Sequence, residues 1–123
     1  MEKELLNIDK ELLLQDLCAR LPYGVKIAIN DKVESLQGIN ILDNVAEYGS
    51  FLSFDIEEVK PYLYPLSSMT TKQKTELSML VVGVEDIFKA FLIEVEFYHK
   101  HHIDYRGLIP MGLAVDATGL NIY

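Results

Sequence analysis

The chain has 123 residues, of which half are hydrophobic, and its 19 acidic and 11 basic side chains give a net charge of −8. A chain of this length and composition folds as one domain and is not intrinsically disordered. The single cysteine excludes an internal disulfide framework and a cysteine-based zinc site. The negative charge argues against broad binding to nucleic acid phosphates or to an anionic membrane surface.

The sequence contains no signal for export or membrane insertion that we recognise. Residues 1–6 lack a basic stretch followed by an apolar one, which argues against a signal peptide. The longest apolar run, residues 79–84, is far shorter than the roughly 20 residues of a membrane-spanning helix. We therefore expect a cytoplasmic protein that has no contact with a membrane.

The first predicted element is a helix over residues 9–21. Asp9 is a suitable N-cap, and Pro22 ends the helix because it forces the preceding residue out of the α region. Cys18 shares one helical face with Leu14, four residues before it. This spacing predicts a buried, unreactive thiol.

Alternating apolar and polar residues predict three strands after this helix. The clearest covers residues 25–30, and a weaker one covers residues 33–42 with a bulge at Gly38. Residues 52–56 form the third. Turn residues separate these segments, which favours a small, curved antiparallel sheet.

Two prolines bracket a fourth extended segment. Pro61 and Pro65 flank residues 62–64, and a proline cannot donate a hydrogen bond to a neighbouring strand. We therefore predict that this segment lies at a sheet edge or in a strand-like loop.

Residues 70–102 are predicted to be helical, beginning at a capping box between Thr70 and Gln73. Apolar and aromatic side chains at a 4-3 spacing form one stripe: Leu77, Val81, Val84, Phe88, Phe91, Val95 and Tyr98. Other apolar residues lie off this stripe: Met79, Val82, Ile93 and Phe97. Either the helix breaks near Gly83 into a helical hairpin, or one long helix buries its second side against a partner chain. We favour the break, because helices of some thirty residues are unusually long.

The last stretch is predicted to be an ordered turn. Asp104 can cap a short helical turn through Leu108 and Ile109, and Arg106 is placed to pair with Asp104. The predicted fold is a single α+β domain over residues 1–123. It has an N-terminal helix, a small curved antiparallel sheet of three or four strands, a C-terminal helical pair and a packed C-terminal turn.

All three histidines lie near the end of the helical region. His99, His101, His102 and Asp104 have side chains that suit zinc and other transition metals. The H-E-x-x-H spacing of a helical zinc site is absent, and cationic side chains also gather at helix C-termini because they complement the helix dipole. The histidines therefore either complement the dipole at the C-terminus of the helix or, as an alternative, form a metal site with metal-dependent activity.

No basic residue lies between Lys32 and Lys60, whereas acidic residues are frequent there. The predicted docking residues are Asp43, Glu47, Asp55, Glu57 and Glu58. The acidic segment could be a solvated sheet face, a surface that docks a basic partner protein, or a decoy that mimics nucleic acid phosphates.

The chain lacks the phosphate-binding, dinucleotide-binding and nucleophile-elbow motifs. We therefore expect no cofactor and a non-enzymatic role through contact with a protein partner. The off-stripe apolar residues favour a homodimer as one such contact.

Three segments show a further resemblance: residues 17–26 (LCARLPYGVK), residues 60–70 (KPYLYPLSSMT) and residues 101–109 (HHIDYRGLI) with the following Gly112, Leu113 and Ala114. They resemble a family of small uncharacterised proteins of gut anaerobic bacteria and their phages or mobile elements. The resemblance covers a little over a third of the chain and implies a bacterial or phage setting. It carries over no catalytic or binding residue, because the family has no assigned activity.

Overall fold

The computed structural model describes residues 7–49 and 52–123, so the predicted absence of a signal peptide over residues 1–6 lies outside the described part. The helices are α1 (Asn7–Arg20), α2 (Thr71–Val81) and α3 (Ile87–Lys100). The strands are β1 (Lys26–Ile29), β2 (Lys32–Asn40), β3 (Val45–Tyr48), β4 (Leu52–Asp55), β5 (Lys60–Pro65), β6 (Ile103–Asp104) and β7 (Val115–Asp116). Short 3-10 turns are η1 (Leu21–Tyr23), η2 (Ile56–Glu58) and η3 (Leu66–Ser68).

The predicted α+β class is confirmed, but the sheet is larger than predicted and is mixed. Its strand order is β4-β3-β2-β1-β5-β6, and β7 also pairs with β5. The strands from β4 to β5 are antiparallel, whereas β6 and β7 run parallel to β5. The prediction missed β6 and β7 because two-residue strands show no alternation, and it also missed β3.

The first two predicted strands match β1 and β2, and the bulge is confirmed as a register shift between Leu36 and Gly38. The third predicted strand is shorter than expected, since β4 ends at Asp55 and the chain turns into η2. Gly38 has a local role here, because a Cβ atom at this position would lie 2.6 Å from the Glu47 carboxylate on β3. The glycine therefore lets the Glu47 side chain fold over β2.

The edge position predicted for residues 62–64 is wrong, because β5 lies inside the sheet. Each neighbour of β5 pairs with a different part of it: β1 with Lys60 and Pro61, β7 with Tyr62 and Leu63, and β6 with Tyr64 and Pro65. The two prolines thus stand near the ends of the strand, where a missing N–H group interrupts little of the ladder. Between the two prolines, the Tyr64 N–H donates to the His102 carbonyl at 2.8 Å.

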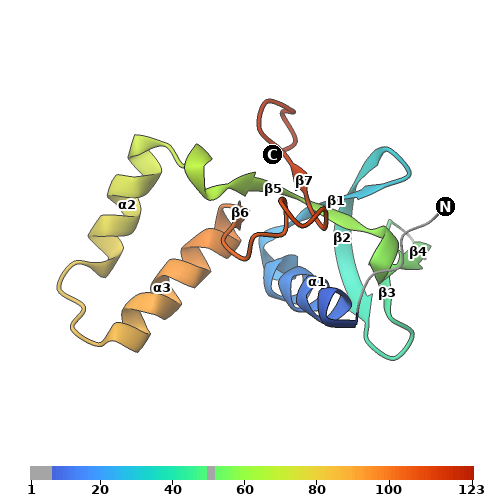
Figure 1. Ribbon diagram of the computed structural model, residues 1–123, viewed down its shortest axis with the longest axis horizontal. Coiled ribbons are helices and arrows are strands. Elements are labelled where there is room, and N and C mark those ends of the chain that lie inside the picture. Colours follow the sequence, from blue (N-terminus) through green and yellow to red (C-terminus); the bar gives the residue numbers. More distant parts are fainter. Residues whose placement is uncertain (1–6, 50–51) are drawn as a thin grey trace.

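Helix α1 packs on the sheet and completes the core (Figure 1). The buried apolar cluster comprises Leu13, Leu17, Val25, Ile27, Ile29, Leu36, Ala46, Ile56, Val59, Leu63, Leu108, Leu113 and Ala114. The prediction that Cys18 is buried is wrong, since its thiol is exposed. The buried face of α1 carries Leu13, Asp16, Leu17 and Arg20, and Cys18 lies outside that face.

The predicted break near Gly83 is confirmed. Helix α2 ends at Val81 and α3 begins at Ile87, so the two form a helical hairpin over residues 71–100. Figure 1 shows this hairpin projecting to one side of the sheet and α1. We call residues 71–100 the hairpin and the other described residues the body. No helix in the described ranges is long and apolar enough to span a membrane.

Candidate functional site

Three local signals form the hairpin. The Thr70 hydroxyl accepts a hydrogen bond from the Gln73 N–H at 3.1 Å, and the Gln73 side chain accepts one from the Thr70 N–H at 3.0 Å, which confirms the capping box. Gly83 adopts the left-handed conformation in the connection, with φ of +79°. Asp86 then caps α3 by accepting from two N–H groups of its first turn, at 2.9 and 3.3 Å.

One side of α3 lies against α2. Leu80 of α2 and Ile93 and Phe97 of α3 line a cavity of about 310 Å³ between the helices. Phe97 is buried, and Ile93 is half-buried. Two of the residues that lie off the main apolar stripe therefore serve the contact between α2 and α3.

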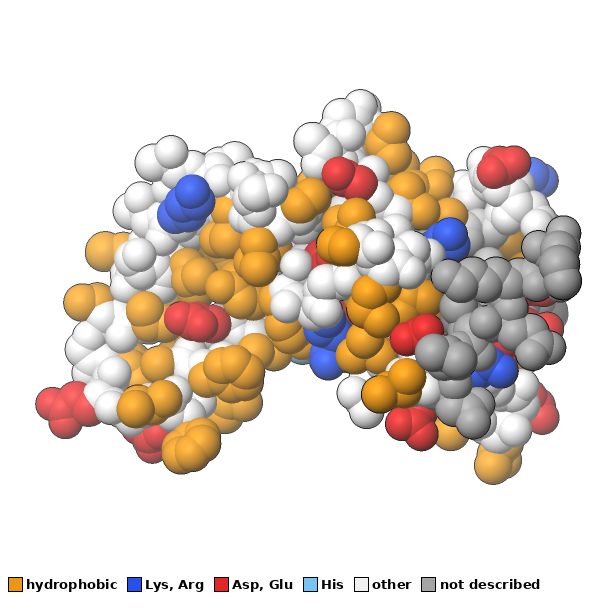
Figure 2. Space-filling view, viewed as in Figure 1, with side chains coloured by type: hydrophobic (Ala, Val, Ile, Leu, Met, Phe, Trp, Pro, Cys, Tyr) orange, Lys and Arg blue, Asp and Glu red, His pale blue; other side chains and the backbone are white. Residues whose placement is uncertain are grey.

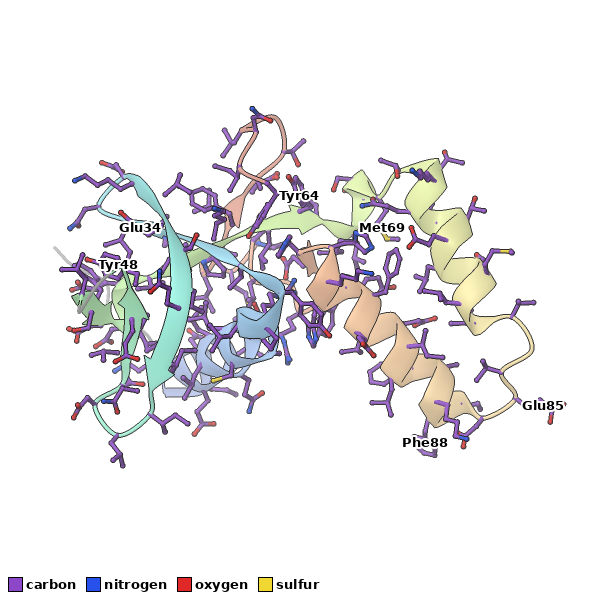
Figure 3. All side chains as sticks on the ribbon, turned by 180° about the vertical axis from the view of Figure 1, so that it is seen from behind. Glu34, Tyr48, Tyr64, Met69, Glu85 and Phe88 are labelled. Atoms are coloured by element: carbon purple, nitrogen blue, oxygen red, sulfur yellow. The ribbon has the colours of Figure 1, made fainter. Side chains whose placement is uncertain are left out.

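Another side of α3 is apolar and exposed, and nothing in the described part of the chain covers it. Its residues are Ile87, Phe88, Phe91 and Leu92, with exposed fractions of 81, 81, 59 and 64%. Their spacing places them along one side of the helix, and Figure 3 shows Phe88 directed away from α2. We call these four residues the apolar face.

Further apolar side chains of the hairpin are exposed on α2 and in the connection between α2 and α3. Met79 and Val82 are exposed in addition to the apolar face. In Figure 2, hydrophobic side chains cover much of the hairpin, and the molecular outline is hollowed between the hairpin and the body. At the base of α3 the body comes close, since the Tyr23 hydroxyl lies 3.4 Å from the Glu96 carboxylate.

A buried polar network joins α1 to the base of the hairpin. The Asp16 carboxylate accepts from Arg20 Nε at 2.9 Å and from Arg106 Nε at 3.1 Å. Arg20 also donates to the carbonyls of Tyr98, at 3.2 Å, and Ile103, at 2.6 Å. Burial raises the pKa of Asp16, and the two guanidinium groups oppose this shift. The predicted pair of Arg106 with Asp104 is therefore wrong.

Tyr105 extends this network to the last turn of α3. Its hydroxyl lies 2.7 Å from His99 Nε2, and its ring stacks on Tyr98 at 5.6 Å. The guanidinium groups of Arg106 and Arg20 lie 5.0 and 5.7 Å from the centre of the Tyr105 ring. Burial, with the two nearby arginines, lowers the pKa of His99 to about 4, so its imidazole is neutral at neutral pH.

The structure does not bring the predicted metal ligands together. His99 faces Tyr105, His101 packs on Phe97 at 4.3 Å, and His102 stacks on Tyr123 at 3.8 Å. Asp104 accepts from the N–H groups of the Leu108 and Ile109 backbone, both at 2.9 Å, as the predicted cap requires. In the described part of the chain, no group of three or more His, Cys, Asp or Glu side chains could hold a metal ion.

His102 separates from the other histidines because α3 has already ended. Its φ of +58° turns the chain from the helix into β6. The ring lies against Tyr123, whose hydroxyl donates to the Tyr62 carbonyl at 2.8 Å and accepts from the Lys26 N–H at 2.9 Å. Burial, with Arg20 and His101 nearby, lowers the pKa of His102 to about 4. This histidine therefore packs the end of the chain onto the sheet.

The predicted docking residues are all exposed, but they do not form one cluster. The register places Glu47 and Asp55 on the same face of the β3–β4 pair, directly opposite Ser53 and Val45. Asp43 lies in the β2–β3 turn, where it accepts from the Asn40 side chain at 3.0 Å.

The remaining two acids belong to η2, next to α1. Glu57 forms an ion pair with Lys10 at 3.0 Å, so part of its charge is neutralised within the chain. Glu58 is exposed on the same turn. Charge is thus spread over a turn, a sheet face and η2.

Comparison of the chain with protein-family models, with curated proteins and with solved structures gave no match.

Two features of the site are not predicted from the sequence: the buried pair of Asp16 and Arg20, and the exposure of the apolar face of α3. The i, i+4 spacing of Asp16 and Arg20, on the same helical face as Leu13 and Leu17, is a signal for a buried ion pair on α1. The spacing predicts apolar residues on two sides of α3, but their exposure depends on where the body lies, which no local pattern encodes.

Proposed function

We propose that this protein is a non-enzymatic protein-binding module, an accessory protein of phage or mobile-element origin, and that the hairpin is its contact element. The observation that carries the proposal is the uncovered apolar face of α3. Contiguous apolar surface on a folded protein usually marks an interaction site. The aromatic side chains Phe88 and Phe91 suit such a site, because aromatic residues are enriched at the centres of protein interfaces.

The core of the body does not need the hairpin. Among the described residues, the hydrophobic core cluster contains side chains of α1, the sheet, η2, residues 25 and 59 and residues 108–114, and it takes none from residues 71–100. The apolar face therefore does not contribute to folding of the body. Burying a Phe or Leu side chain against a partner gains about 1.5–3 kcal/mol, so the four residues together can supply the energy of a specific contact.

The test removes the apolar face without touching the body. The variant Phe88→Asp/Phe91→Asp places two charges on exposed positions, and the matched control Leu42→Asp changes a side chain that is 96% exposed in the β2–β3 turn. Sedimentation velocity measures association of the purified protein with itself. Affinity purification followed by mass spectrometry compares the proteins that bind wild type and each variant.

We expect the double variant to lose its protein contacts and the control variant to keep them. At concentrations too low for association, circular dichroism and the thermal midpoint should be unchanged in both, because the altered side chains lie outside the core. Contacts that survive in the Phe88→Asp/Phe91→Asp variant would overturn the proposal, whether or not Leu42→Asp keeps them.

A further inference from the structure

We infer that the partner of the apolar face is a second copy of this chain, and that the two α3 helices pack antiparallel across a two-fold axis. This inference rests on the proposed function and names its partner. A two-fold contact buries the same surface on both copies and closes on itself. The apolar face meets the first requirement, since one stripe of large side chains can interdigitate with its own image.

The shape of the molecule favours the antiparallel arrangement. The tip of the hairpin, near Glu85, is free, whereas its base is flanked by the body (Figure 3). At the base, Tyr23 approaches Glu96, and Tyr105 lies against His99. Parallel helices would bring two bodies to the same end of the contact. Antiparallel helices place the free tip of each hairpin in the hollow beside the body of the other copy, which Figure 2 shows from one side.

Charge along the hairpin favours the same direction. Glu85 and Asp86 make the tip acidic, and both are exposed. Lys100 is exposed at the base, in the last turn of α3. Antiparallel packing sets the acidic tip of one copy against Lys100 of the other, and it also pairs opposite ends of the two helix dipoles. Parallel packing would set like charges together.

The polar edge of the helix fixes the register. Lys89 and Glu96 are both exposed, and seven residues apart on α3 they lie on the same edge of the apolar face. A two-fold axis perpendicular to the helices brings this edge of one copy against the same edge of the other. With the axis passing close to Leu92, Lys89 of each copy faces Glu96 of the second copy, and Glu85 faces Lys100.

The first experiment tests this register by charge reversal. Lys89→Glu and Glu96→Lys each place like charges at both symmetric pairs, so each variant alone should associate about tenfold more weakly than wild type in sedimentation equilibrium. An equimolar mixture of the two variants restores both pairs and should form a heterodimer of near wild-type affinity. The double variant Lys89→Glu/Glu96→Lys should also dimerise. A mixture no stronger than its components overturns the antiparallel register.

The second experiment tests direction by cross-linking in a Cys18→Ser background, which removes the exposed native thiol. Leu92→Cys places two thiols next to the two-fold axis, so a short bis-maleimide should join the two copies. Phe88→Cys places them about 13 Å apart along the helices, so it should not cross-link. Equal cross-linking at both positions indicates parallel helices and overturns the inference.

The outcomes separate the inference from the proposed function. A wild-type protein that stays monomeric at high micromolar concentration overturns the second copy as partner. The proposed function then stands only if another protein binds and the Phe88→Asp/Phe91→Asp variant releases it. A dimer that survives in the Phe88→Asp/Phe91→Asp variant overturns both the inference and the proposed function.

Discussion

Helices α1 and α3 are equally long, 14 residues each, yet they are used in opposite ways. Helix α1 buries two leucines and also the charged pair Asp16 and Arg20. Helix α3 is the more apolar of the two, but Phe97 is its only buried residue. Burial in this molecule therefore follows the position of a helix relative to the sheet, and the apolar face of α3 has no counterpart surface in the described part of the body.

The largest loss of stability is expected where the buried ion pair between Asp16 and Arg20 is broken. Asp16→Ala leaves the Arg20 guanidinium buried without its carboxylate partner, and breaking a buried pair in this way costs about 3–5 kcal/mol. Urea denaturation measures the loss of unfolding free energy. The control Glu11→Ala, on the exposed side of the same helix, should change stability by less than about 0.5 kcal/mol. Similar losses in both variants would show that the network is not what holds α1 in place.

Acidification should destabilise the protein through His99, at the base of the hairpin, and through His102, which packs the end of the chain onto the sheet. The pKa values of His99 and His102 are lowered to about 4, whereas the unfolded chain binds protons near pH 6.5. Because the unfolded state takes up these protons first, the free energy of unfolding should fall as the pH drops from about 6.5 to about 4. Urea denaturation between about pH 7 and pH 5 measures this dependence above the range where most carboxylates titrate.

The variant His99→Gln/His102→Asn isolates the histidine contribution. Asparagine tolerates the left-handed conformation that His102 adopts. The variant should show a flatter dependence of stability on pH than wild type. An equally steep dependence in both proteins would assign the acid sensitivity to other groups.

A smaller effect is expected at the start of the hairpin. Thr70→Ala removes the hydroxyl of the capping box and should cost α2 about 1 kcal/mol. The hairpin gives no side chain to the hydrophobic core cluster, so we expect it to open locally, and hydrogen exchange of the α2 amides is a better readout than the thermal midpoint. Thr71→Ala, at the neighbouring exposed position, keeps the cap and should leave exchange nearly unchanged.

The difference between body and hairpin also shows what sequence reasoning could reach. Local signals predict β1, the bulge before Gly38, the capping box at Thr70 and the break at Gly83. They also predict α1, but the N-cap assigned to Asp9 is wrong, because the helix already includes Asn7 and Asp9 lies in its first turn. Contacts between distant residues were not predictable in this way. Arg106 pairs with Asp16, 90 positions earlier, and not with its neighbour Asp104.

The same limit applies to the sheet and to the candidate site. The parallel partners of β5 are two-residue segments far along the chain, and their short length hides any alternation. The histidines are close in sequence, but the end of α3 and the left-handed His102 turn their rings toward different neighbours. Proximity in sequence therefore suggested a metal site that the fold does not assemble.

The smallest effect on stability is expected at the apolar face. Phe88→Ser changes a side chain that is 81% exposed, so below the concentration of association it should alter the free energy of unfolding by less than about 0.5 kcal/mol. Leu17→Ala in the body, a buried leucine, should cost about 2–5 kcal/mol. If Phe88→Ser instead costs as much as Leu17→Ala, the phenyl ring is part of the core and the contact role is wrong. If Phe88→Ser costs almost no unfolding free energy but weakens association, the phenyl ring of Phe88 contributes to contact with another protein molecule and not to the stability of its own chain.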